Sequence, residues 1–328
     1  MTGRTIPALL GVVYVTVLAA GFLAPSDPLH QHRDHAFAPP TRLHFVDAAG
    51  ALHVRPFVYA PDGGTGASSP VRFFVRGHSY RIAGLFSSDR HLFGTDGAVP
   101  LFLLGTDEYG RDVFSRLLYG GQISLLAGLL GAGLSLSAGV LFGTLAGFYG
   151  SWVDDAVMRV AELFLALPWL YLLLAVRMML PLHLEPGATF LLLVGVIALV
   201  GWARPARLIR GLVLETTSRD YVVAARSIGA SDRQLLWRHV LPQLRGVTLT
   251  QAALLVPQYT LAEVTLSFFG LGVGEPVPSW GNMMASLQRY HVLASYWWMF
   301  APALAIVPMF LLYYLLADRL HQQAAYSL

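Results

Sequence analysis

The sequence predicts an all-α polytopic membrane protein with six transmembrane helices and a small β-rich extracytoplasmic insertion. Of its 328 residues, 55% are hydrophobic and only 12% are charged, and the mean hydropathy is +0.56. A soluble domain of this length does not normally reach these values. A transmembrane helix needs roughly 20 mostly apolar residues. Runs of this kind lie at 6–24, 119–148, 156–180, 189–209, 246–270 and 297–317.

The first run predicts a transmembrane helix at residues 1–24. Arg4 before the run and the small residues at 19–21 also fit a signal peptide. The run continues through Phe22 and Leu23, however, and the five remaining spans would put the two termini on opposite sides of the membrane. We therefore favour a span.

Arginine placement predicts the orientation, because basic residues gather in short cytoplasmic connections. The end of the fourth run and the segment that follows it are rich in arginine, whereas the connection before the sixth run contains only Arg289. We therefore place this segment in the cytoplasm, which puts both termini on the cytoplasmic side and residues 25–104 outside. Its arginines are Arg204, Arg207, Arg210, Arg219, Arg226, Arg233, Arg238 and Arg245.

Residues 25–104 are predicted to form the extracytoplasmic insertion. Residues 43–46 and 52–54 are β-formers on either side of a turn at 47–50, so they predict a hairpin, and residues 71–82 supply further β-like sequence. Near its start, His30, His32 and His35 have the chemistry of a nickel or zinc site. We favour a solvated loop and assign no metal, because no fixed scaffold orients these rings.

The composition excludes several classes of function. All 22 basic residues are arginine, so the lysine-containing phosphate-binding loop of common ATPases is absent. The chain has no cysteine, which removes disulfides, thiolate metal sites and cysteine nucleophiles. The arginines are spread along the chain, so the net charge of +3 does not indicate nucleic acid as a partner. We predict no catalytic residue and no cofactor.

Two other classes of membrane protein were weighed on the residues inside the runs. An ion-coupled secondary transporter needs several buried ionisable groups near mid-membrane, and the one convincing candidate is Glu263. A membrane-embedded hydrolase needs a nucleophile with a base, or a metal pair, and the runs contain no histidine. Both classes remain alternatives to be tested by experiment.

Four polar or glycine-rich segments interrupt the apolar pattern, at 105–116, 143–155, 219–242 and 262–282. In the first of them, Thr106 and Asp107 are predicted to cap a short interfacial helix. The third contains two short helical patterns that meet at residues 229–232. There Gly229 is expected to end the first helix, and Ser231 or Asp232 to cap the second.

These four segments, together with Ala224-Ala225-x-x-x-Gly229 and Leu241-Pro242, resemble the inner-membrane permease subunits of ATP-binding-cassette (ABC) importers, specifically the C-type permeases of the dipeptide/oligopeptide/nickel group. The resemblance covers roughly residues 100–320. It implies the type I ABC importer permease fold, with residues 105–328 as a five-helix permease core and 219–242 as a cytoplasmic coupling hairpin.

The resemblance also implies partners, a location and a substrate class. The partners are a second permease subunit, two cytoplasmic ATPase subunits, an extracytoplasmic solute-binding protein and the lipid bilayer. The location is the inner membrane of a bacterium or archaeon, and ATP hydrolysis is expected on the separate ATPases. The cargo is peptides or a similar small solute, and nickel or another small solute is an alternative within the same family.

In the resembled family the hairpin carries the EAA motif, whose helix docks in a groove of the ATPase. Val223 stands where that motif has its glutamate, so the acidic contact is absent from this chain. Small residues suit close approach of a helix to a groove. The residues expected to couple to the ATPase are Tyr221, Ala224, Ala225, Arg226, Gly229, Ala230, Ser231 and Asp232.

Two further sets of residues are expected to line the translocation path or to pack helices. Glu263 and Ser267 lie in the fifth run, and a membrane-embedded carboxylate is costly enough to indicate a function. The resemblance also places a glutamate at position 263. Gly139, Gly143 and Gly147 form a smooth helix face that suits close packing. The sequence leaves open whether this face meets a partner permease or a neighbouring span.

Overall fold

A computed structural model describes residues 5–47, 49–60, 68–82, 86–95, 99–181 and 184–326. The chain divides into two compact units, which are described separately. Unit 1 consists of Met1–Pro7, Leu125–Glu263 and Phe310–Leu328, and unit 2 consists of Ala8–Ser124 and Val264–Met309. The division falls within the helices α1 (Thr5–Leu18), α3 (Val113–Tyr149), α11 (Arg245–Phe268) and α14 (Ala301–Tyr326).

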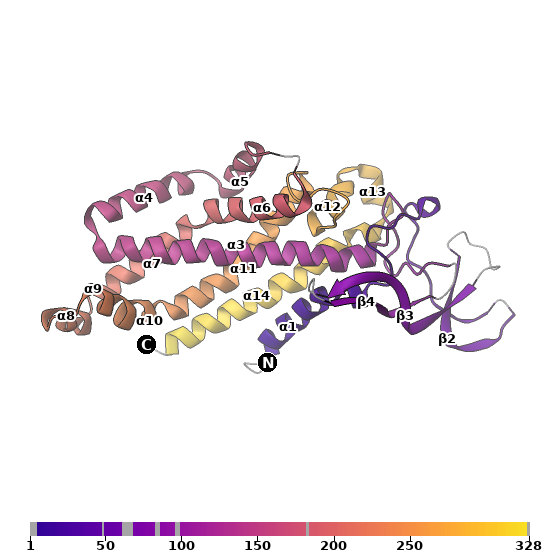
Figure 1. The fold of residues 1–328 in the computed structure, drawn as a ribbon, viewed down its shortest axis with the longest axis horizontal. Helices are drawn as coiled ribbons and strands as arrows, with labels where there is room; N and C mark the ends of the chain where they lie inside the picture. The colour runs from indigo at the N-terminus through magenta and orange to yellow at the C-terminus, as the bar shows by residue number, and fades with distance from the viewer. Residues whose placement is uncertain are drawn as a thin grey trace. The chain divides into compact units, whose positions relative to one another are not determined.

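The regular secondary structure in the described residues of unit 1 is all helical (Figure 1). Besides parts of α3, α11 and α14 it contains α4 (Ser151–Ala166), α5 (Trp169–Met178), α6 (Pro186–Gly201), α7 (Ala203–Thr217), α8 (Asp220–Ser227), α9 (Asp232–Gln234), the π-helical η2 (Leu235–Val240) and α10 (Leu241–Gln243). Two helix pairs are bent, α4 with α5 by 92° and α6 with α7 by 42°. Pro168 explains the sharper bend, because the residue before a proline is driven to extended backbone, and Leu167 has ψ 147°.

The membrane-crossing potential of these helices supports part of the six-span prediction. Within the described residues, α3 and Trp297–Gln323 are each long and apolar enough to cross a bilayer, and the number rises from two to four if each bent pair is one span. These four match the second, third, fourth and sixth predicted runs. The helices α1 and α11 coincide with the first and fifth runs but are not among the four candidates.

The helix α3 begins earlier than its predicted run. The run was placed at 119–148, whereas the helix starts at Val113. The difference arises because Ser115 and Arg116 in the first turn are polar, and hydropathy alone excludes them. Both side chains are nevertheless buried, with Arg116 only 1% exposed.

Unit 2 combines short helices with a sheet. Its helices are α2 (Ala20–Leu23), η1 (Arg33–His35), α12 (Trp280–Met284), η3 (Ala285–Gln288), α13 (Tyr290–Ser295) and η4 (Trp297–Phe300), together with parts of α1, α3, α11 and α14. The strands are β1 (His44–Val46), β2 (Leu52–Tyr59), β3 (Ser68–Ile82) and β4 (Phe86–Thr95). They form one antiparallel sheet in the order β1-β2-β3-β4 (Figure 1).

The predicted β-hairpin is confirmed as β1 and β2. Its turn is held by Asp47, whose Oδ1 accepts hydrogen bonds from the backbone N–H groups of Ala49 and Ala51, each at 2.9 Å. Gly50 has φ 84°, a conformation that favours glycine. The strand β4 was not predicted, because its polar centre at residues 87–90 hides the alternation that identifies a strand.

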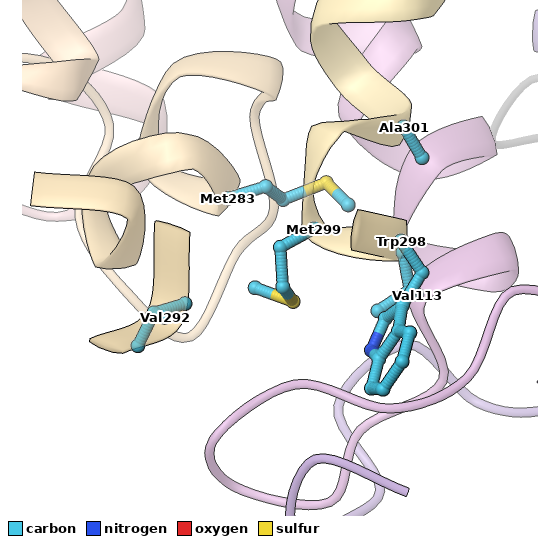
Figure 2. Packing of buried hydrophobic residues seen from close by; sticks show 6 residues of the cluster. All are labelled: Val113, Met283, Val292, Trp298, Met299 and Ala301. Atoms are coloured by element: carbon cyan, nitrogen blue, oxygen red, sulfur yellow. The ribbon is translucent and has the colours of Figure 1, made fainter. Parts of the chain in front are cut away.

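One apolar cluster of unit 2 lies among the segments that follow α11 and the start of α3. Figure 2 shows Met283, Val292, Trp298, Met299 and Ala301 converging with Val113. Trp298 also donates its indole N–H to the Thr106 carbonyl at 3.0 Å, which satisfies the polar atom of a buried side chain. This packing fixes the loop before α3 against the segment before α14.

Candidate functional site

The hairpin at 219–242 begins with α8, and its first helix ends as predicted. Gly229 has φ 91°, a left-handed conformation that ends a helix and that glycine adopts without strain. The N–H groups of Gly229 and Ala230 bond back to the carbonyls of Arg226 and Ala225 at 3.0 and 3.1 Å. A Cβ at Gly229 would meet nothing within 4 Å, so the backbone angle, and not crowding, requires glycine here.

Ser231 caps the second helix, which confirms one of the two predicted caps. Its hydroxyl accepts from the Gln234 N–H at 3.4 Å, and the Gln234 Oε1 accepts from the Ser231 N–H at 2.9 Å. This reciprocal arrangement is a capping box. Asp232 is the first residue of α9 and adds a negative charge to the helix N-terminus.

The hairpin is anchored by apolar side chains that point into unit 1. Val222 and Leu235 are buried. Val240 packs in a cluster with Ile209 and Val213 of α7. The base of the hairpin is therefore packed directly against α7.

The outward surface of the hairpin carries most of the predicted coupling residues. Ala225 and Ala230 are half-buried, and the others are exposed, namely Tyr221, Ala224, Arg226, Gly229, Ser231 and Asp232. Large apolar side chains stand beside them, with Val223 51%, Ile228 88% and Trp237 69% exposed. Exposed apolar groups among small residues are typical of a surface that contacts another protein.

Two ring contacts orient the hairpin's longer side chains. Tyr221 lies beside His239, with ring centroids 5.9 Å apart. The Arg226 guanidinium lies over the ring of Phe148 near the end of α3, 5.6 Å from its centroid. A cation over an aromatic face at this distance is attracted by the ring. Arg226 is thus directed toward α3.

The glycine face of α3 packs against α7 of the same chain. A Cβ at Gly139 would lie 2.5 Å from Pro205, one at Gly143 would lie 2.4 Å from the Ala206 carbonyl oxygen, and one at Gly147 would lie 2.8 Å from the Arg210 carbonyl oxygen. No side chain fits at these separations. In this structure the glycine face is therefore occupied by α7, a neighbouring helix of the same chain.

An ion pair that the sequence analysis missed lies in the same region. Arg210 of α7 donates its Nε to Asp154 Oδ1 at 2.5 Å, and its Nη2 donates to Asp154 Oδ2. Both side chains are partly buried, so the fork of the guanidinium locks the start of α4 to α7. No spacing rule joins two residues 56 positions apart, so this pair could not be predicted from the sequence.

Glu263 and Ser267 are both fully covered within the chain. Glu263 is 0% exposed at the end of the unit 1 portion of α11. Ser267, in unit 2, is 2% exposed, and Cβ atoms built at Gly272 and Gly281 would collide with it. Ser267 therefore sits where the backbone at Gly272 and Gly281 approaches closely, and its role in lining a path or packing helices stays a prediction. Whether Glu263 lines a path stays a prediction.

A buried charge cluster joins two loops of unit 2. Arg111 is 5% exposed and donates its Nε to Asp107 Oδ2 at 2.7 Å. Its two terminal nitrogens bind Glu275, at 2.5 and 3.2 Å, and Arg116 Nη2 binds Glu275 Oε1 at 2.9 Å. Burial opposes the charge on Arg111, but Glu275 and Asp107 outweigh it and raise the pKa of Arg111 above its usual range.

The predicted helix caps in this loop are wrong. Thr106 and Asp107 do not cap a helix: the Asp107 carboxylate accepts from the N–H groups of Tyr109 and Arg111 in a tight turn. Asp112 caps α3 instead, accepting from the Ser115 N–H at 2.9 Å. Burial raises the pKa of Asp112 to about 6, against the hydrogen bonds from Ser115 that lower it.

The histidines near the start of the insertion contact aromatic rings mainly edge to face. The His30 and His32 centroids are 4.5 Å apart, and His32 and His35 each contact the ring of Phe102. Within the described residues, no group of three or more histidine, aspartate or glutamate side chains is arranged to hold a metal ion. Burial, with the neighbouring histidines, lowers the pKa of His32.

Comparison with known protein families identifies the class to which this helical unit and hairpin belong. Residues 139–326 match the model of the binding-protein-dependent transport system inner membrane component. The matched segment includes the glycine face, the hairpin, Glu263 and Glu275. The chain therefore belongs to this family, a family of transport permeases.

Individual relatives share this region. The chain is 39% identical to the di/tripeptide transport system permease protein DppC of Pseudomonas aeruginosa (strain UCBPP-PA14), over 69% of its own length and 72% of the relative's. It is 37% identical to the dipeptide transport system permease protein DppC of Bacillus subtilis (strain 168), over 62% of its own length and 61% of the relative's. It is 35% identical to the glutathione transport system permease protein GsiD of Pectobacterium atrosepticum, over 74% of its own length and 77% of the relative's. The chain thus spans about three fifths of the length of the B. subtilis protein.

Proposed function

We propose that this chain is the permease subunit of an ATP-driven importer, and that it forms, with a second permease, the path by which peptides cross the membrane. The family match over 139–326, which contains the complete hairpin, carries this proposal. Relatives named for dipeptide, di/tripeptide and glutathione transport favour small peptides over nickel.

The proposed topology has six spans with both termini in the cytoplasm of a bacterial or archaeal cell. The four candidate spans supply most of it, and α1 and α11 supply the remaining two. The arginine-rich hairpin then faces the cytoplasm, as the positive-inside rule requires. The sheet of residues 44–95 faces the opposite side.

The energy source in this proposal is external to the chain. The sequence has no lysine for a nucleotide-binding loop of the usual kind. Two cytoplasmic ATPase subunits would therefore hydrolyse ATP, and an extracytoplasmic binding protein would deliver the peptide. The exposed Ala224 and Gly229 surface is the proposed contact with the ATPase, where Val223 replaces an acidic contact with an apolar one.

The proposed coupling follows from the anchoring of the hairpin. A displacement of α8 passes through Val222 and Val240 to α7, which is packed without a gap on the glycine face of α3. The Asp154–Arg210 pair carries the same displacement to α4. Closure of the ATPases would thus move several helices together and change which side of the path is open.

The test is the energy requirement of uptake. Cells carrying this chain with its partner subunits take up a labelled dipeptide, and the supply of ATP and the proton gradient are removed separately. We expect uptake to stop on ATP depletion and to persist when the gradient is collapsed. The opposite pattern would assign the chain to ion-coupled transport. Competition by unlabelled di- and tripeptides, glutathione and Ni²⁺ then ranks the substrates.

A further inference from the structure

The β3–β4 hairpin of unit 2 is attached to the end of the first apolar helix segment. The ring of Tyr80 on β3 lies against Gly21 of α2, where a Cβ would be only 2.1 Å from the ring. Phe74 of β3 lies beside Phe22 of α2, with ring centroids 6.3 Å apart. The β3–β4 hairpin therefore packs against the C-terminal end of the apolar segment formed by α1 and α2, shortly before the polar residues Ser26 and Asp27.

Two arginines of the β3–β4 hairpin, Arg76 and Arg90, lie near this contact with α2. Arg76 and Arg90 are directly opposite each other in the antiparallel register, so their side chains share one face of the sheet. The Tyr80 hydroxyl donates to the Arg90 carbonyl at 2.7 Å, which ties this position to the side chain packed on Gly21. Phe74 lies two residues before Arg76 on β3. We call Phe74, Arg76 and Arg90 the arginine face.

The side chains of the arginine face are exposed, and its two positive charges repel each other. Both arginines are exposed, and Phe74 is 62% exposed. Among the described residues, neither guanidinium has a carboxylate within ion-pair distance. Like charges directly opposite each other in a sheet are destabilising, and the exposed Phe74 ring adds apolar surface on the same strand as Arg76. An anion next to an apolar phase would relieve both costs.

We propose that the β3–β4 hairpin is a membrane-surface element whose arginine face binds anionic phospholipid headgroups beside the end of α2. Aromatic rings and arginines are the side chains that favour the boundary between hydrocarbon and headgroups. Phe74 is continuous with Phe22 of a segment that is apolar from Ile6 to Leu23. This inference rests on α1 and α2 lying in the bilayer, as in the proposed six-span topology.

The test uses fluorescent labels at single cysteines, because the native chain contains no cysteine. The full chain, with its partner subunits, is reconstituted in nanodiscs after Phe74→Cys, Val12→Cys or Val54→Cys substitution. Val12 on α1 is 61% exposed and reports whether the first helix is in lipid. Val54 on β2 is 93% exposed and is the aqueous reference within the same sheet. Quenching by spin-labelled lipids is compared with quenching by iodide.

We expect lipid-borne quencher to reach the labels at 12 and 74, and iodide to reach the label at 54. A label at 74 that iodide quenches as strongly as the label at 54, while the label at 12 remains in lipid, would overturn this inference and leave the topology intact. An aqueous label at 12 would overturn both. Protection of position 74 from iodide only when the solute-binding protein is added would assign the face to that protein and overturn the lipid proposal.

The preference for anionic lipid is tested in the Phe74→Cys background. Quenching by spin-labelled phosphatidylglycerol is divided by quenching by spin-labelled phosphatidylcholine. Each arginine near a membrane surface contributes about a fivefold preference for anionic lipid, so the ratio should fall several-fold in the Arg76→Gln/Arg90→Gln double variant. The control is Arg55→Gln, an exposed arginine of β2, which should leave it unchanged. Equal ratios in the double variant and the control would contradict the proposal.

Discussion

The guanidinium of Arg111 binds both carboxylate oxygens of Glu275, although the two residues are 164 positions apart in the sequence. Arg116 binds the same carboxylate from the first turn of α3. Both arginines are almost fully buried, whereas Glu275 is 42% exposed. Glu275 therefore compensates two buried cations together with Asp107, and it joins the loop before α3 to the loop after α11.

The Glu275→Gln substitution tests the clamp that Glu275 forms with Arg111 and Arg116. Among the described residues it leaves Asp107 as the remaining carboxylate partner of Arg111 and Arg116, and uncompensated buried charge is costly. Because Glu275 is partly exposed, solvent screens part of the effect. We expect the free energy of unfolding to fall by about 1–3 kcal/mol. The measurement is thermal unfolding in one detergent. The exposed Arg289–Glu108 pair is the control, since Arg289→Gln should cost less than about 1 kcal/mol. Equal losses would contradict a buried clamp.

Asp112 should make stability depend on pH. Its folded pKa is about 6, above the ordinary 3.8, so between these values the folded state holds a proton that the unfolded state has released. Stability should fall as pH rises through this window, by at most about 3 kcal/mol. Asp112→Asn keeps an acceptor for Ser115 and removes the ionisation. The variant should therefore show a flatter unfolding profile from pH 4 to 6, whereas Asp89→Asn, at an exposed site, should not.

The glycine face of α3 predicts opposite effects for two chemically identical substitutions. Gly143→Ala places a methyl group against the Ala206 carbonyl and should cost about 1–3 kcal/mol by overpacking. Gly133→Ala lies in the same helix with nothing within 4 Å and should stabilise by about 0.5–1 kcal/mol through helix propensity. Unfolding of both variants in detergent decides the matter. A neutral Gly143→Ala would remove the argument for tight α3–α7 packing.

The sequence predicted the features that follow from local rules. Helix termination by Gly229, capping by Ser231 and the β1–β2 hairpin all depend on residues close together in the chain, and the structure confirms them. Hydropathy also found the long helices, but it misplaced the start of α3, because a buried Arg116 looks like a surface residue until its distant partner is known.

The parts that could not be predicted depend on contacts between distant segments. Glu275 and the Asp154–Arg210 pair have no signature in spacing, since their partners come from other elements. The caps proposed at Thr106 and Asp107 failed for the same reason: Asp112, five residues after Asp107, is equally able to cap a helix, and tertiary packing selects it. The role of the coupling residues in transport stays a prediction, because geometry alone shows an exposed hairpin.

The most direct test of the account is the coupling of ATP hydrolysis to uptake in the Gly229→Val variant. A β-branched residue at φ 91° is strongly strained, so the turn between α8 and α9 should be displaced while the helices remain inserted. The matched control is Gly211→Val, in α7 with nothing within 4 Å. We expect Gly229→Val to assemble with its partners but to lose peptide uptake and its stimulation of ATP hydrolysis, whereas Gly211→Val should retain both. Normal uptake by Gly229→Val would contradict it.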